Sequence, residues 1–171
     1  MTTVPTTESR LDEIDRRLLW ELSNDGRASV NELSSRLHVS RANAYARLRR
    51  MLDAGVIEQF GAQVSPQRAG LGTSALVLLT IRQAEWRDVR DRLARVPGVD
   101  HIALCAGTAD VVVLVRTSDT VGLREIVLEE IRTVPGVLAS RTTLILDEAR
   151  GGSVPSVFAG TLAEQAKRRH C

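Results

Sequence analysis

The sequence predicts an α+β protein in two parts, a segment of three short helices followed by a βαββαβ domain. Three observations carry this prediction. Apolar residues recur at helical spacing up to Gly55, with two short interruptions. The second half repeats one strand–helix–turn–strand pattern, and its strands are apolar on both faces. The chain therefore combines a small helical domain with a sheet that needs cover on both sides.

The first two helices have clear starts and stops. Apolar residues three and four positions apart predict a helix from Leu11 to Leu22, which Asn24-Asp25-Gly26 ends. Ser29 and Glu32 have the spacing of a capping box, in which each side chain accepts a hydrogen bond from the other residue's backbone amide. A second helix is therefore expected to begin at Ser29.

A third helix follows after a short turn at His38-Val39. Ser40 is a suitable N-terminal cap, and Gly55 marks the end of the helix. The inner face of this helix is expected to carry three apolar residues, Ala44, Leu48 and Met51. Three short helices with a tight turn before the third match a helix-turn-helix.

The segment from Val56 to Val64 alternates apolar and other residues, which predicts a strand, the wing of a winged helix-turn-helix. These features predict four regions along the chain. They are a winged helix-turn-helix domain over 1–64, a linker over 65–72, a ferredoxin-like domain over 73–149 and a C-terminal tail over 150–171. The end of the tail, Thr161 to Arg169, is basic and is interpreted as a mobile basic tail, with a short helix as the alternative.

The ferredoxin-like prediction depends on an internal repeat. Val96-Pro97-Gly98-Val99 recurs as Val134-Pro135-Gly136-Val137, an offset of 38 residues. Helix positions before each turn match at the same offset, Val89 with Val127 and Leu93 with Ile131. Two copies of strand, helix, turn and strand give the βαββαβ order.

The strands also predict an assembly. The runs 75–79 and 111–115 are apolar on both alternating faces, which is typical of strands buried on both sides. Two helices in this topology cover only one face of the sheet. A second copy of the chain is the simplest cover for the other face, so we expect a homodimer through the sheets.

Composition limits the remaining possibilities. The net charge is only +2, and no apolar run is long enough to cross a membrane. Residues 1–10 are polar, which does not fit a signal peptide. The two cysteines, Cys105 and Cys171, suggest no disulfide framework, and Cys105 is expected in the core. We therefore expect a cytoplasmic protein.

The sequence resembles the Lrp/AsnC family of transcription regulators from about Leu11 to Leu146. The N-terminal part of the resemblance includes Leu11-Asp12, Asp15, Asp25-Gly26-Arg27, Glu32-Leu33, Val39-Ser40, Arg47 and Gly55-Val56-Ile57. The C-terminal part includes both Pro-Gly-Val turns and Gly107-Thr108-Ala109-Asp110, where the family usually has an aromatic residue in place of Ala109. The resemblance implies a regulator whose dimers assemble into larger even-numbered oligomers and respond to an amino-acid effector.

The resemblance also implies an effector pocket between dimers. The residues that it assigns there are His101, Gly107, Thr108, Ala109 and Asp110. The carboxylate of Asp110 would accept hydrogen bonds from the ammonium group of the effector. The alternative is that Asp110 is a turn residue that satisfies backbone amides.

Double-stranded DNA is the expected partner of the third helix. Arg41 is placed to bind guanine and Asn43 to bind adenine, each through two hydrogen bonds, because recognition helices present their N-terminal residues to bases. Arg47 and Arg50 are expected on phosphates. The full predicted interface is Ser29, Ser40, Arg41, Ala42, Asn43, Tyr45, Arg47 and Arg50. The alternative is that the arginines form an ordinary solvated face.

Two other functions compete with an effector-dependent regulator. Siroheme decarboxylases resemble this family and carry Tyr-Arg-Arg followed by His, but the segment from His101 to Cys105 has no arginine. An architectural DNA-binding protein without an effector is the second alternative. The sequence contains no motif for a catalytic nucleophile, a cofactor or a metal. We therefore expect no enzymatic activity, cofactor or metal site.

Overall fold

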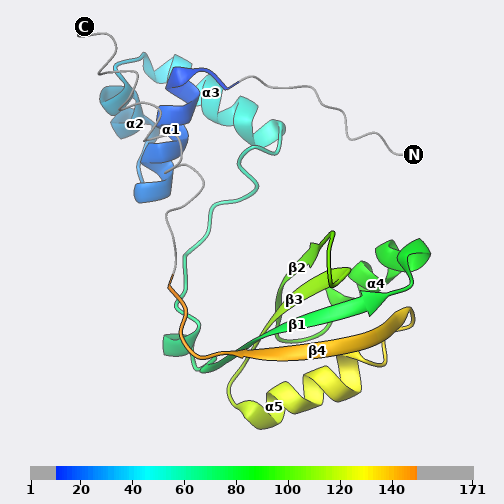
Figure 1. Ribbon diagram of the computed structural model, residues 1–171. Helices are drawn as coiled ribbons and strands as arrows, with labels where there is room; N and C mark the ends of the chain where they lie inside the picture. The colour runs from blue at the N-terminus through cyan, green and yellow to red at the C-terminus, as the bar shows by residue number, and fades with distance from the viewer. Residues whose placement is uncertain (1–10, 150–171) are drawn as a thin grey trace, which may run out of the picture. The chain divides into compact units, whose positions relative to one another are not determined.

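The computed structural model describes residues 11–149 and divides them into two compact units, one ending at Ala62 and one spanning Gln63–Ala149 (Figure 1). Each unit is described separately below. The C-terminal tail that the sequence predicts over 150–171, including the segment from Thr161 to Arg169, lies outside the described residues.

The N-terminal unit consists of the three predicted helices, α1 (Glu13–Asn24), α2 (Val30–Leu37) and α3 (Arg41–Asp53). Each begins at a residue whose side chain accepts a hydrogen bond from a backbone amide of the first turn, which would otherwise have no partner. These caps are Asp12 for α1, Ser29 for α2 and Ser40 for α3. The predicted capping box at Ser29 is confirmed, since Glu32 also accepts from the Ser29 amide at 2.7 Å.

The turn between α2 and α3 is short and left-handed. His38 has φ +53°, and it is the one residue other than glycine with a positive φ in the described part of the chain. Its amide donates to the carbonyls of Ser34 and Ser35 and so ends α2. Ser40 then starts α3 at once, which gives the predicted helix-turn-helix.

The helices pack around a small apolar cluster. Leu18, Leu37 and Met51 form its buried centre, and partly buried side chains such as Leu11 and Leu48 surround it. Ala44 is also buried, so the inner face predicted for the third helix is correct.

The predicted wing strand is wrong for this structure. Residues 56–64 adopt no strand, and the sheet of the chain begins only at Thr73. Phe60, whose alternation with Ala62 and Val64 led to the prediction, is 52% exposed. Period-two apolar patterning shows that a segment suits a pleated surface, but a strand also needs a neighbour with which to form ladder hydrogen bonds.

The C-terminal unit has the predicted βαββαβ order. Its four strands are β1 (Thr73–Ile81), β2 (Val99–Leu104), β3 (Val111–Thr117) and β4 (Val137–Ile145). The helices are α4 (Trp86–Leu93) and α5 (Thr120–Glu125), and α5 continues as a π-helical turn, η3 (Ile126–Ile131). Two short 3₁₀ turns, η1 (Gln67–Ala69) and η2 (Gln83–Glu85), flank β1. The strands form one antiparallel sheet in the order β2-β3-β1-β4.

The two Pro-Gly-Val turns are equivalent in the structure and both need glycine. Gly98 and Gly136 have φ of +84° and +92°. A Cβ on Gly98 would lie 2.8 Å from the carbonyl oxygen of Arg116, and one on Gly136 would lie 2.8 Å from Cγ2 of Val89. The chain therefore turns in a left-handed conformation directly against its neighbours, which only glycine permits.

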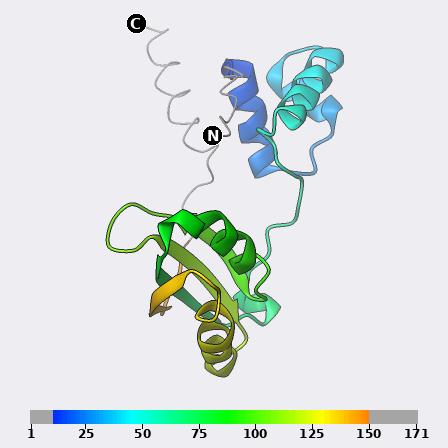
Figure 2. The same cartoon turned by 90° about the vertical axis from the view of Figure 1, so that its right-hand side faces the viewer.

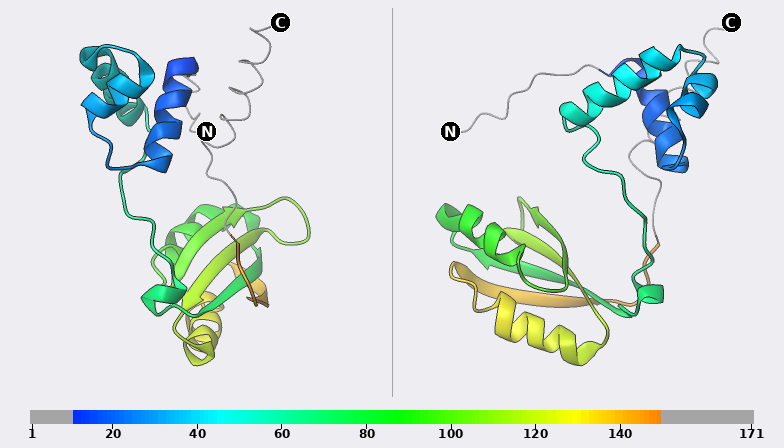
Figure 3. Two further views of the ribbon diagram at one scale, coloured as in Figure 1. Left: turned by 90° about the vertical axis from the view of Figure 1, so that its left-hand side faces the viewer. Right: turned by 180° about the vertical axis from the view of Figure 1, so that it is seen from behind.

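Both helices cover the same face of the sheet, as Figures 2 and 3 show. The helix-facing side of β1 and β3 is fully buried and includes Val77, Leu79 and Val113. On the opposite face Leu76 pairs with Leu114, and Leu78 pairs with Val112. These four side chains are only partly buried. The strands are therefore apolar on both faces, as predicted, and α4, α5 and η3 cover one of them.

Cys105 does not lie in the core, as the sequence led us to expect, because it is exposed. The apolar run that contains it leaves the sheet at Leu104, where β2 ends and the turn toward β3 begins. In the described part of the chain no helix is both long and apolar enough to cross a membrane.

Candidate DNA-binding and ligand-binding sites

The outward face of α3 is the first candidate site. Arg41, Ala42, Asn43 and Tyr45 are all exposed, and the Tyr45 side chain is 56% exposed. Arg49 and Arg50 extend the same helix, and Asp53 is its one acidic residue. The face thus presents cations, an amide and an aromatic ring to solvent.

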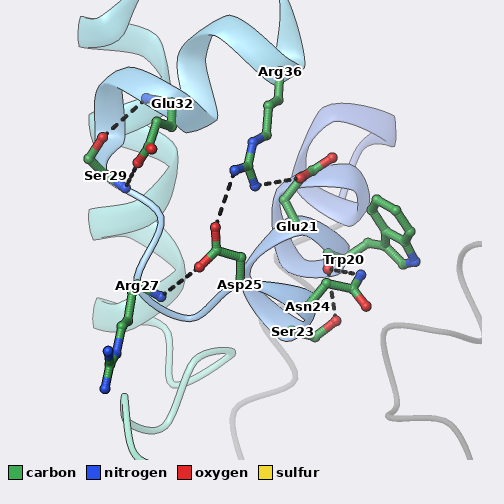
Figure 4. A network of polar contacts seen from close by, with 9 residues as sticks. All are labelled: Trp20, Glu21, Ser23, Asn24, Asp25, Arg27, Ser29, Glu32 and Arg36. Carbon is green, nitrogen blue, oxygen red and sulfur yellow. Dashed lines mark hydrogen bonds and ion pairs between the residues drawn. The ribbon is translucent and has the colours of Figure 1, made fainter.

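Ion pairs connect α2 to the end of α1 (Figure 4). Arg36 on α2 donates to Glu21 at 3.1 Å and to Asp25 at 3.2 Å. These two carboxylates raise the pKa of the Arg36 guanidinium. Figure 4 also shows Ser29 and Glu32 in their reciprocal cap at the start of α2.

The two serines of the predicted interface serve as helix caps. The Ser29 hydroxyl accepts from the Glu32 amide at 3.3 Å, and the Ser40 hydroxyl accepts from the Asn43 amide at 3.2 Å. Both remain exposed at helix N-termini, where backbone amides favour anions. The Glu32 carboxylate already occupies part of this region at α2.

The sequence predicts phosphate contacts for Arg47 and Arg50. In the structure both arginines instead bind carboxylates at the N-terminal end of α1. Nη1 of Arg47 lies 2.6 Å from Asp12 and 2.8 Å from Asp15, and Nη2 of Arg50 lies 2.5 Å from Asp15. The Asp15 side chain is completely buried. These hydrogen bonds raise the pKa of Arg47. Sequence reasoning missed the two aspartates, although both belong to the motif that resembles the family.

Arg47 also contacts Asn43, which the sequence predicts to bind a base. Its Nε donates to Oδ1 of Asn43 at 2.6 Å. Asn43, Ala46, Arg47 and Arg50 line a shallow hollow of about 280 Å³ on this face. The structure therefore brings Asn43, Arg47 and Arg50 together, while Arg41 lies at the N-terminal end of the helix.

The second candidate site lies around the connection from β2 to β3. Asp110 at its end accepts two hydrogen bonds, at Oδ1 from the Gln83 side chain at 3.0 Å and at Oδ2 from the Ile81 amide at 2.9 Å. The hydrogen bond from the Gln83 side chain lowers the pKa of Asp110, and the hydrogen bond from the Ile81 amide lowers it further. Asp110 thus ties the start of β3 to the end of β1, which supports its alternative role as an amide-satisfying residue.

A hollow of about 140 Å³ lies beside this connection. It brings Thr108 and Ala109 together with Arg141 on β4, and its lining also includes Leu78, Leu79, Thr80, Ala139 and Ser140. Gly107, with φ +153°, and Asp110 flank Thr108 and Ala109 in the chain. His101 lies on the edge strand β2, opposite Leu114, and does not line the hollow.

Arg141 is the residue that sequence reasoning missed here. It pairs with Leu78 in the β1–β4 ladder, across more than 60 residues of sequence. Only the register of that ladder places it at the hollow that Thr108 also lines. No group of three or more His, Cys, Asp or Glu residues within 11–149 has an arrangement that could hold a metal ion.

Comparisons with known proteins assign a family to each of the two domains. Residues 11–58 match the family of winged helix-turn-helix DNA-binding domains, and residues 74–154 match the Lrp/AsnC ligand-binding domain. The HTH-type transcriptional regulator PH0140 of Pyrococcus horikoshii is 32% identical over 153 residues, covering 89% of this chain and 97% of the relative. A second regulator of that organism, PH1916, is 35% identical and covers 74% of this chain and 87% of the relative.

Solved structures show the same architecture. The leucine response regulatory protein LrpA of Mycobacterium tuberculosis has a TM-score of 0.74 at 33% identity, covering 82% of this chain and 96% of that protein. A transcriptional regulator of Neisseria meningitidis, solved in complex with L-Met, has a TM-score of 0.74 at 26% identity, with 82% and 93% covered. The chain therefore belongs to the Lrp/AsnC family and is a DNA-binding transcriptional regulator with a ligand-binding domain.

Proposed function

We propose that this regulator recognises a specific DNA sequence through α3 and that its assembly and operator binding respond to an amino-acid effector. The observation that carries the proposal is the exposed face of α3. Arg41, Asn43 and Tyr45 project from its first turns, where recognition helices contact bases. A regulator of this kind acts in the cytoplasm, with the DNA.

The uncovered face of the sheet supports a homodimer. Leu76, Leu78, Val112 and Leu114 form an apolar band on the side that α4 and α5 leave open. A second copy would bury this band and bring two recognition helices to one operator. Dimers of this kind would then assemble into larger even-numbered oligomers.

The hollow beside Thr108 supports a small zwitterionic effector. Arg141, which lines the hollow, is a suitable partner for its carboxylate. Asp110 follows the lining residue Ala109 in the chain and is the candidate partner for the ammonium group, through the lone pairs that its two hydrogen bonds within the chain leave free. The relative from N. meningitidis was solved with an amino acid, L-Met. The apolar side chain of Ala109 would contact the rest of the ligand.

The DNA function is tested by selecting sites from a random-sequence duplex library and measuring Kd on the selected site. Arg41→Ala should cost about 1–3 kcal/mol in a base contact, which is roughly 5- to 150-fold in Kd. The control, Arg124→Ala, removes an exposed arginine from α5 and should leave Kd within about twofold. Equal losses for the two variants would contradict the assignment of α3 as the reading helix.

The dimer is tested by sedimentation of the full chain. Leu114→Arg places a charge in the apolar band and should convert dimers into monomers. The control, Val121→Arg, places the same charge on the exposed surface of α5 and should leave the assembly intact. Monomers in the unmodified protein at micromolar concentration would refute the sheet-mediated dimer.

The effector is tested by thermal unfolding against a panel of the twenty amino acids. A ligand present at about 100 times its Kd stabilises a single site by about 2.7 kcal/mol. Arg141→Gln should remove this shift, whereas the control Arg132→Gln, on the surface at the end of η3, should retain it. If no amino acid shifts the unmodified protein, the architectural DNA-binding protein becomes the better description.

A further inference from the structure

A buried carboxylate on α1 is connected to the exposed amide on α3 that is proposed to read DNA. Asp15 has no exposed side-chain surface, and its two oxygens accept from Arg47 and Arg50. Its Oδ2 also accepts from the backbone amide of Asp12, within the cap of α1. The carboxylate is therefore fixed by both helices.

Arg47 connects this fixed carboxylate to the Asn43 side chain. One guanidinium nitrogen, Nη1, donates to Asp12 and Asp15, and Nε of the same planar group donates to Asn43 Oδ1 at 2.6 Å. An arginine has only donors, so the Asn43 amide must turn its oxygen toward Arg47. The Nδ2 group, with two hydrogens, is then the part of the amide that remains for a base.

The orientation of the amide has a consequence for base choice. Two-bond recognition of adenine requires an oxygen for the N6 amino group and a nitrogen for N7. Guanine instead presents two acceptors, O6 and N7, in the major groove. An asparagine whose oxygen is already engaged by a cation, and whose NH₂ group is free, suits guanine better.

We propose that Arg47 and Asp15 are positioning residues that set the base preference of Asn43 to guanine rather than adenine. The proposal rests on the proposed function, because it requires α3 to lie in the major groove. It replaces the adenine contact that the sequence alone suggests for Asn43, and it gives Arg47 a role besides a phosphate contact.

The experiment compares the base preferences of matched variants, each selected on a random-sequence duplex library. Asn43→Ala identifies the base pair that Asn43 reads. Arg47→Lys keeps the positive charge near Asp15 but removes Nε, so the preference at that base pair should change from guanine toward adenine. Arg50→Lys is the control, because Arg50 contacts Asp15 and not Asn43. It should change affinity without changing the preferred base.

A second variant keeps the test decisive if Arg47→Lys does not fold. Asn43→Asp lies on the exposed surface and retains an oxygen for Arg47, but it replaces the NH₂ donor with a second acceptor. The preference should then change from guanine to cytosine, whose N4 amino group is a donor.

The outcomes separate the two proposals. Adenine at the Asn43 position in the unmodified protein, or one unchanged preference in folded Arg47→Lys and Asn43→Asp, would overturn the positioning role while α3 remains the reading helix. The absence of any enriched sequence for the unmodified protein would overturn the proposed function itself, and this inference with it.

Discussion

The two units of this regulator are stabilised in different ways. The C-terminal unit has a core cluster of fourteen buried aliphatic residues between one sheet face and its helices. The N-terminal unit has three residues at the centre of its main cluster, and beside them a fully buried carboxylate, Asp15, bound by two arginines. The helical unit therefore depends on ion pairs beside a small core. The sheet unit also has a buried arginine, Arg116, bound to Asp100 and Glu148, but it adds these ion pairs to a much larger apolar core. The ion pairs of the helical unit order arginines on the face proposed for DNA.

Asp15→Ala gives the largest effect expected from this difference. Removing the buried carboxylate takes one hydrogen bond from each of Arg47 and Arg50, and a hydrogen bond to a charged group typically contributes about 1.5–3 kcal/mol. The guanidinium groups that remain are partly exposed, and Arg47 keeps its bond to Asp12. Native-state hydrogen exchange should show faster opening of α1 to α3 and unchanged protection of β1 and β3. The control, Asp53→Ala, removes an exposed carboxylate 3.8 Å from Arg49 and should cost less than about 1 kcal/mol. A small effect at Asp15 would mean that apolar packing alone maintains the helical unit.

Leu79→Ala tests the contribution of apolar packing to the sheet unit. Its side chain is fully buried in the sheet core, and such a truncation typically costs about 2–5 kcal/mol. Hydrogen exchange should now accelerate in the sheet and leave α1 to α3 unchanged. Val121→Ala, an exposed truncation on α5, is the matched control and should be near neutral. Equal acceleration in both units would show that they unfold together.

Gly136→Ala measures how tightly the sheet unit is packed at its second Pro-Gly-Val turn. The new Cβ would lie 2.8 Å from Val89 Cγ2 and 2.9 Å from Glu85 Oε2. Gly70 has nearly the same φ, +90°, but no atom within 4 Å of such a Cβ, so Gly70→Ala isolates the backbone strain. Denaturant unfolding should give a difference of about 1–3 kcal/mol between the variants. Equal costs would show that Val89 and Glu85 move aside freely.

The pH dependence of the stability of the helical unit is the smallest of the effects that we expect. Partial burial would raise the pKa of Asp12, but hydrogen bonds from Arg47 and from the Asp15 amide outweigh it, so this pKa is lowered. A carboxylate with a lowered pKa stabilises the folded state above its unfolded pKa of about 4. This contribution is lost as the pH falls through the lower, folded value.

The stability of α1–α3, measured by hydrogen exchange, should therefore fall less steeply below about pH 4 in Asp12→Asn than in the unmodified protein. Because half of the Asp12 side chain is exposed, solvent screens the effect and keeps it small. Asp53→Asn, a matched substitution on α3, should leave the acid limb unchanged. Identical acid limbs for Asp12→Asn and the unmodified protein would contradict the role of Asp12.

Local patterns in the sequence predicted most of the fold. Helix caps such as Ser29 and Ser40 involve neighbours within three residues, and the repeated Pro-Gly-Val turns fixed the βαββαβ order. The wing strand at 56–64 was wrong because the alternation of Phe60 contains no information about a pairing partner. Cys105 was misplaced for a related reason, since an apolar run does not show where its strand leaves the sheet.

The candidate sites were less predictable because they depend on distant pairs. The outward position of Arg41 follows from helix periodicity, but the contact of Arg47 with Asp15 joins residues 32 positions apart. Arg141 likewise comes to line the same hollow as Thr108 only through the register of β4 on β1. Periodicity indicates which face a residue occupies, whereas side-chain partners require the packed structure.

The ladder between β1 and β4 has a consequence for the topology of the C-terminal unit. Ser74, near the start of β1, pairs with Ile145, the last residue of β4, so the chain enters and leaves this unit on adjacent strands (Figure 1). A short linker across these ends would close residues 73–149 into a ring that keeps Glu148, the partner of the buried Arg116. The ring can be reopened at the exposed connection around Gly107 without breaking a strand. The sheet and helices should therefore fold as an isolated circular permutant, with every cross-strand pair retained.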